Sequence, residues 1–288
     1  MCKRNTDDPL LRQFFDQYGL HLLKIPREIV AVGDVYLHDG KSTAHIGNVA
    51  DLLTGSFELP PMKIGEAMAD VAGKVSNKVP AKAGLNLADS FLAALGAGGM
   101  IAGLEAKYAQ NKEVGVRFRF VSAVRDFVDV LPLGRKLLKH KLRSDQPLAG
   151  KKNRYFVVSG VAKSSAINIS VESESSKSLD LDVKALQMAG VEAGVAVQKT
   201  NEGEVSFQGA KQLVFGVQLY ELVVEKERNV LKLLLPQHAV RVLSDAAAGP
   251  VVEPAVIGGP DSDALFDVEY DDQPKKRRNR TGRGRRDA

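Results

Sequence analysis

The sequence predicts an α+β protein in which helices decorate a largely antiparallel β-sheet. Three observations favour this class. Between positions 155 and 235 most apolar residues alternate with polar ones, which is the period of a half-buried strand. The connections in this region are short and polar, so hairpins are the natural way to pair its segments. Two other segments, near the N-terminus and around residue 130, repeat their apolar residues at helical spacing instead.

The N-terminal half mixes helical and extended patterns. Asp8 and Pro9 precede an apolar stripe that includes Phe14 and Phe15, which predicts an N-capped helix ending at Gly19. A second, short helix is predicted at 48–53, and a longer one at 122–142 with an interruption at Pro132. A short apolar run at 20–25 is closed by Pro26, and the predicted strands of this half are 29–38, 70–79 and 114–120.

The C-terminal half is predicted to consist of strands. Residues 213–224 are apolar on both faces, as in the centre of a sheet, and 230–235 is the expected neighbour of this strand. The remaining predicted strands are 155–161, 167–171, 179–185, 191–198 and 205–207.

Charge separates the C-terminal tail from the rest of the chain. The 288 residues carry a formal charge of +5, but eight of the 40 basic residues and one of the 35 acidic ones lie in 275–288. The other residues therefore hold 32 basic and 34 acidic side chains, a charge of about −2. The tail is predicted to be disordered, and it could bind phosphate groups or merely aid solubility. No basic patch interleaved with aromatic residues stands out in the rest of the chain, so no nucleic-acid partner is expected for the core.

Motifs of catalysis are scarce. The five histidines are scattered without ligand spacing, so no metal site is predicted, and the sequence contains no P-loop or nucleophile elbow. The single cysteine, Cys2, excludes a disulfide scaffold. Cys2 has three interpretations: an N-terminal nucleophile of an amidohydrolase, a site of S-acylation, or an unmodified thiol. Charged residues occupy the place of a signal-peptide core, so we expect the protein to start in the cytosol.

One uncharged segment raises the question of a membrane. Residues 90–104 lack charge but are too short and too rich in glycine for a spanning helix, which needs about 20 apolar residues. A membrane β-strand needs only about 9–11 alternating residues, although any half-buried strand alternates as well. The candidates for membrane-strand side chains are Val71, Val75, Val79, Ile167, Ile169, Val171, Leu179, Leu181, Val183, Val191, Val195 and Val197.

Two segments resemble bacterial gasdermins. They are the opening Met-Cys with DPLLRQFFDQYGLHLLKIPRE (8–28), and the run QLVFGVQLYELVVE (212–225). The resemblance implies a pore-forming protein of anti-phage defence, not an enzyme. It implies a twisted sheet core that a short C-terminal segment, packed on it, keeps inactive in the cytoplasm. A protease, often caspase-like, removes that segment, and the core then oligomerises with membrane lipids into a β-barrel in the inner membrane. The family's N-terminal cysteine is palmitoylated, which implies covalent palmitate on Cys2 and no other cofactor.

The C-terminal composition fits this scheme. We expect a pore-forming core at 1–244, a cleavable linker at 245–263, an autoinhibitory peptide at 264–274 and a disordered basic tail at 275–288. Residues 264–270 could instead complete the core as a last strand. The residues expected to be open to cleavage are Ala246, Ala247, Ala248, Gly249, Val251, Val252, Ala255, Val256, Ile257, Gly258 and Gly259. Autoinhibitory contacts are expected from Leu265, Phe266, Val268 and Tyr270, and lipid-headgroup contacts from Arg135, Lys136, Lys139, Lys141 and Arg143.

Overall fold

A computed structural model describes nine stretches of the chain. They are residues 14–15, 17–38, 43–68, 71–75, 81–97, 114–143, 153–173, 194–201 and 204–234. Cys2, the linker at 245–263, the peptide at 264–274 and the basic tail lie outside the described residues, so the domain boundaries predicted there stay predictions.

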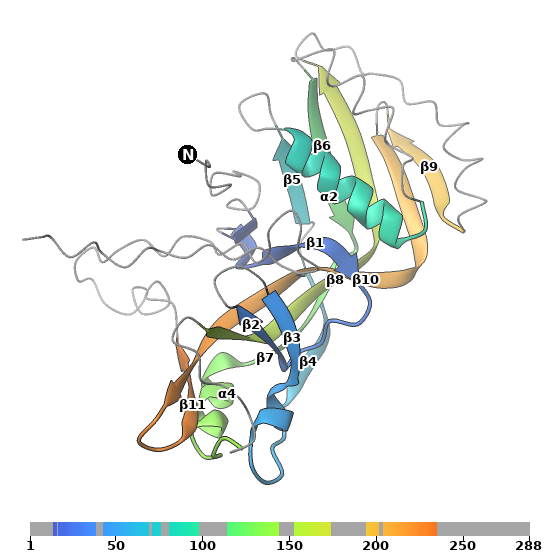
Figure 1. Cartoon of the computed structure of the whole chain (residues 1–288). Helices are drawn as coiled ribbons and strands as arrows, with labels where there is room; N and C mark the ends of the chain where they lie inside the picture. The colour runs from blue at the N-terminus through green and yellow to red at the C-terminus, as the bar shows by residue number, and fades with distance from the viewer. Residues whose placement is uncertain are drawn as a thin grey trace, which may run out of the picture.

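Two long antiparallel strands form the centre of the molecule. β8 (Arg154–Ser173) and β10 (Glu204–Glu225) pair from Tyr155↔Leu222 to Ser170↔Glu204, and we call this pair the central ribbon. In Figure 1 the ribbon runs the length of the molecule, from the end that carries α2 to the end that carries α4. The sequence pattern divided each of these strands in two, because the alternation is interrupted near Ser164 in β8 and near Lys211 in β10. The buried hydroxyl of Ser164 bridges the interruption in β8 by donating to the carbonyl oxygen of Val121 at 2.7 Å.

Short strands follow one another along both outer edges of the ribbon. β2 (Asp34–His38), β7 (Val124–Val128) and β6 (Val114–Val121) pair with β8, whereas β11 (Val230–Leu234), β1 (His21–Arg27) and β9 (Ala196–Asn201) pair with β10. A further layer adds β3 (Thr43–Asn48) to β2, β4 (Met62–Ala67) to β7 and β5 (Val71–Val75) to β6. These eleven described strands form one open sheet in which every pairing is antiparallel, which confirms the predicted fold class.

The start of one predicted helix and the end of another agree with the structure. The short 3₁₀ helix η1 (Val49–Leu52) begins where Asn48 accepts a hydrogen bond from the backbone of Ala50 at 3.2 Å. The first helix ends at Gly19, whose φ of +64° lies in the left-handed region that glycine adopts readily. Of that helix, only residues 14–15 and 17–18 are described.

Three boundary predictions were wrong. Residues 122–142 are not one helix: Ser122 turns the chain, β7 follows, and only α4 (Val130–Leu137) is helical. Pro132 lies in the first turn of α4, where its missing N–H leaves no helical hydrogen bond unmade, so it interrupts nothing. Pro26 does not close β1, which continues to Arg27 through an irregular register. The strand predicted at 29–38 is restricted to β2, because a turn occupies the residues before Asp34.

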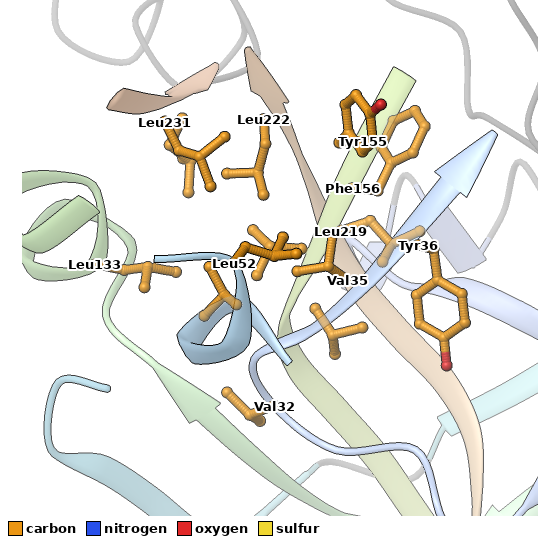
Figure 2. Close-up of a cluster of buried hydrophobic side chains, with 14 of the residues drawn as sticks. Val32, Val35, Tyr36, Leu52, Leu133, Tyr155, Phe156, Leu219, Leu222 and Leu231 are labelled. Carbon is orange, nitrogen blue, oxygen red and sulfur yellow. The ribbon is translucent and has the colours of Figure 1, made fainter. Parts of the chain in front are cut away.

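The ribbon supports a separate hydrophobic cluster near each end. The α2 cluster gathers side chains from α2 (Ala81–Ala94), β6, β9 and the adjoining halves of β8 and β10. The α4 cluster gathers side chains from α4, η1, β2, β11 and the other halves of the long strands. Figure 2 shows part of the α4 cluster, where Leu133, Leu222 and Leu231 lie around Leu52. Each end of the sheet therefore has its own helix and its own core.

Candidate membrane-inserting sheet

Five strands form an antiparallel sheet at the α2 end, in the order β5-β6-β8-β10-β9. The apolar residues of these strands converge on one face because successive residues of a strand point to opposite faces. The buried side chains on this face are Val71, Phe118, Phe120, Ile167, Ile169, Val197, Val205 and Phe207, all within the α2 cluster. We call this five-stranded sheet the α2 sheet.

Helix α2 covers the apolar face of the α2 sheet. Ala88, Phe91 and Leu92 are fully buried, and the ring of Phe91 meets the ring of Phe120 edge-on with centroids 5.1 Å apart. Contact at the end of the helix is close, since a methyl group on Gly209 of β10 would lie only 2.5 Å from Cδ2 of Leu95. The apolar face is thus a closed core for as long as α2 stays in place.

The opposite face of the α2 sheet is polar. Arg119, Asn168 and Ser206 share one register row across β6, β8 and β10. The carboxylate of Glu204 accepts hydrogen bonds from Asn168 at 2.9 Å and from Arg119 at 3.3 Å. The α2 sheet therefore separates an apolar face from a polar one, as a sheet between hydrocarbon and water would have to do.

Two long connections leave the α2 sheet from the same end. β5 and β6 are neighbours in an antiparallel pair, yet residues 76–113, including α2, lie between them, whereas a hairpin loop needs about 2–5 residues. Residues 174–203, including β9, lie between β8 and β10. The pairings Val114↔Ser173 and Ser170↔Glu204 bring the ends of these connections together.

The structure brings the described membrane-strand candidates into one place. Val71, Ile167, Ile169, Val195 and Val197 are all buried in the α2 cluster. Val75 and Val171 lie within β5 and β8, and the outcome for Val79, Leu179, Leu181, Val183 and Val191 lies outside the described residues. That these side chains meet lipid stays a prediction. Helix α2, which covers them, was not predicted, although Ala88, Phe91, Leu92 and Leu95 show the spacing of an amphipathic helix.

The predicted headgroup residues lie at the other end of the ribbon. Arg135 and Lys136 belong to α4, and Lys139, Lys141 and Arg143 follow it. Lys136 is engaged within the protein, because its ammonium donates to the carbonyl oxygens of Glu58 at 3.1 Å and Leu59 at 3.4 Å. Figure 1 places α4 at the end of the molecule opposite β9 and the start of β6. In this conformation, a flat bilayer that meets the strand ends would not meet these basic residues.

A polar cluster within β2 and β3 makes structural contacts at the α4 end. The carboxylate of Asp34 accepts a hydrogen bond from the backbone of Ala31 at 2.8 Å and lies 3.6 Å from Nε2 of His45. Burial raises the pKa of the Tyr36 phenol, and the negative charge of Asp34 raises it further. Tyr36 therefore stays protonated well above its ordinary range.

The described part of the chain contains neither a membrane-spanning helix nor a cluster of metal ligands. None of its helices has the length and hydrophobicity needed to cross a bilayer. Its histidine, aspartate and glutamate side chains form no cluster of three or more that could hold a metal ion.

Comparison with known proteins connects this architecture to one family. The model of the Bacterial Gasdermin Family matches residues 23–229. Gasdermin bGSDM of a Vitiosangium species is 28% identical over 268 residues, which cover 91% of this chain and 97% of that protein. Gasdermin bGSDM of Lysobacter enzymogenes is 23% identical over 217 residues, covering 73% of this chain and 79% of that protein.

A solved structure shares the fold. The structure of a bacterial gasdermin from Bradyrhizobium tropiciagri superimposes with a TM-score of 0.58 at 19% sequence identity, covering 81% of this chain and 93% of that one. The family match spans most of the ribbon and the helices at both of its ends. The chain therefore belongs to the bacterial gasdermin family, a family of pore-forming proteins rather than enzymes.

Proposed function

We propose that this protein is an autoinhibited pore-former that waits in the cytoplasm until a protease removes its C-terminal segment. The freed core then oligomerises in the inner membrane as a β-barrel and kills the cell during phage infection. The observation that carries this proposal is the α2 sheet, whose apolar face packs against α2 and whose two long connections leave from one end.

The α2 sheet has the composition and chain length that a hairpin insertion needs. Residues 76–113 and 174–203 provide about 15 to 19 residues for each of four prolonged strands, and a membrane strand needs about 9–11. Exposing the apolar face to water would cost about 25 cal/mol per Å², whereas exposing it to hydrocarbon would not. Release of α2 is therefore favourable only where lipid or a neighbouring subunit replaces it.

Family membership overturns the alternative that the sequence left open. An amidohydrolase with Cys2 as its nucleophile is an enzyme, and the bacterial gasdermins are pore-forming proteins instead.

Cys2 keeps its other proposed role as a site of palmitoylation. A single acyl chain gives only marginal membrane affinity, so a second signal is needed, and the basic residues around α4 could supply it during first encounter with an anionic surface. Intact-protein mass spectrometry tests this, since palmitate adds a defined mass and its absence contradicts the role.

The proposed inhibition depends on the covalent connection between the inhibitory peptide and the core. Residues 264–274 combine apolar residues with acids, and the linker at 245–263 tethers them to the core. The tether holds the peptide at an effective concentration in the millimolar range, so weak contacts are enough to keep it bound. Cleavage lowers that concentration to the bulk value and lets the peptide dissociate. The activating protease is proposed to be a caspase-like or other peptidase that recognises this linker.

A dye-leakage assay tests the proposed function. A recognition site for a sequence-specific protease is placed between Ser244 and Ser262, and the protein is added to dye-filled vesicles of bacterial lipids before and after cutting. Leakage is expected only from the cut protein. The control is the unaltered chain treated with the same protease. Absence of leakage from both forms would refute the proposal, and equal leakage from both would refute the autoinhibition.

A further inference from the structure

We propose that β9 is a removable guard strand: it covers the edge of β10 to which β5 of a second copy of this chain pairs during assembly. This inference rests on the proposed pore-forming function and adds the contact through which neighbouring copies join. It follows from the directions of the strands, from the path of the chain and from what holds β9 in place.

Strand direction identifies the edge that a second copy needs. Every pairing in the α2 sheet is antiparallel, so β5, β8 and β9 run in one direction and β6 and β10 run in the other. If the β5 strand of a second copy paired with β9, the two strands would be parallel. If it paired with β10 instead, the two strands would be antiparallel, which is how strands pair in membrane barrels built from hairpins. β9 now occupies that edge of β10 from Glu204 to Gln208.

The path of the chain leads to the same requirement. β8 ends at Ser173 at the tip of the sheet, and β10 starts beside it at Glu204. β9 runs back toward this tip and reaches β10 after only residues 202–203. While β9 is paired, the chain preceding β10 therefore folds back along the sheet. β8 and β10 can be prolonged together as one hairpin only after residues 196–203 leave the edge and extend β10 outward.

The packing couples the release of β9 to the release of α2. β9 is held by a short ladder with β10, and its buried side chain Val197, like the adjoining Val195, belongs to the α2 cluster. The same cluster contains Phe91 and Leu92 of α2. When α2 leaves, the apolar cluster that includes Val195 and Val197 loses Phe91 and Leu92, and the attachment of β9 to β10 weakens. The edge of β10 would thus open after activation rather than before it.

A reversible covalent lock tests the guard role. Gln198→Cys and Ser206→Cys are introduced together, because these two positions pair directly between β9 and β10 and Gln198 is exposed. The matched control carries Val223→Cys and Lys232→Cys, a directly paired and exposed couple between β10 and β11 at the α4 end. Both variants carry the engineered linker site, and each is cut and added to dye-filled vesicles when oxidised and again after reduction.

The oxidised Gln198→Cys/Ser206→Cys protein should bind vesicles but leak at least tenfold more slowly than the same protein after reduction. The control pair should leak equally in both states. Leakage from the oxidised lock at the reduced rate would overturn the guard role. Failure of the cut protein without added cysteines to leak would instead contradict the proposed pore function, so the two failures are distinguishable.

The partner strand is tested by crosslinking between copies. One preparation carries Ser206→Cys, and four others each carry one cysteine at Val71, Ala72, Gly73 or Lys74 of β5. The Ser206→Cys protein is mixed with each of the four, cut on vesicles and oxidised. At least one β5 position should give a crosslinked dimer that depends on cutting and exceeds the background of the parent chain, whose only cysteine is Cys2. Absence of such a dimer at all four positions would overturn the proposed β5–β10 contact.

Discussion

If α2 is the cover of the membrane-inserting face, loosening α2 should speed pore formation, whereas loosening α4 should not. Leu92 of α2 and Leu133 of α4 allow a matched comparison. Both are leucines on helices, both are completely buried, and they belong to the two clusters at opposite ends of the ribbon. The substitutions Leu92→Ala and Leu133→Ala therefore remove the same atoms from equivalent surroundings.

The size of the effect follows from the burial of these side chains. Replacing a fully buried leucine by alanine costs about 2–5 kcal/mol, through lost burial and the cavity left behind. A helix that is about 2.7 kcal/mol less firmly held is released about 100 times faster if its contacts are already lost in the transition state. Chemical denaturation should show a similar loss of unfolding free energy for both variants. Dye leakage after linker cutting should accelerate by up to about 100-fold for Leu92→Ala only.

Either of two results would refute the proposed role of α2. If Leu92→Ala leaks no faster than the parent while denaturation shows the expected loss of stability, release of α2 does not limit pore formation. If Leu133→Ala accelerates leakage as much as Leu92→Ala, general destabilisation explains the effect and α2 has no special role.

Three further predictions concern other parts of the molecule. Because burial raises the pKa of Tyr36, its protonated form contributes stability that is present below its ordinary pKa of 10.0 and is lost as the pH rises above it; urea unfolding should show this fall, and Tyr36→Phe should reduce it. Gly209→Ala should cost about 1–3 kcal/mol by overlap with Leu95, and a double-mutant cycle with Leu95→Ala should recover most of that loss, whereas simple additivity would exclude the contact. Arg135→Glu with Lys139→Glu should lower leakage from anionic vesicles about tenfold at low salt and leave neutral vesicles unaffected; unchanged leakage would exclude a headgroup role for this group.

Periodicity and local polar signals were enough to predict many individual elements. Alternation identified the strands around Ile167 and Phe207 and the faces on which their side chains lie, because the direction of a side chain in a strand depends only on its position. The capping of η1 by Asn48 and the end of the first helix at Gly19 also depend on neighbouring residues alone. The resemblance to gasdermins then indicated the family, which the comparisons confirm.

Predictions failed where contacts with distant segments determine the secondary structure. Val124, Phe127 and Val128 have helical spacing, yet they form β7 because β4 and β8 offer edges on both sides and Lys163 of β8 binds Asp126 by an ion pair. Whether a segment forms a strand depends on such neighbouring strands more than on the intrinsic preference of its own residues. In β8, Ser164 at the interruption also makes a contact with distant Val121.

The sequence by itself determined that this chain forms amphipathic strands, and through the resemblance it indicated the pore-forming family. Only the tertiary structure decided which strands share the candidate membrane-inserting face, that α2 covers this face, and that β9 occupies the edge of β10. Pairing partners and strand order connect residues that are far apart in the chain, such as Val71, Ile169 and Val205. Their register is fixed by packing across the whole sheet, and a periodic sequence pattern is compatible with many registers.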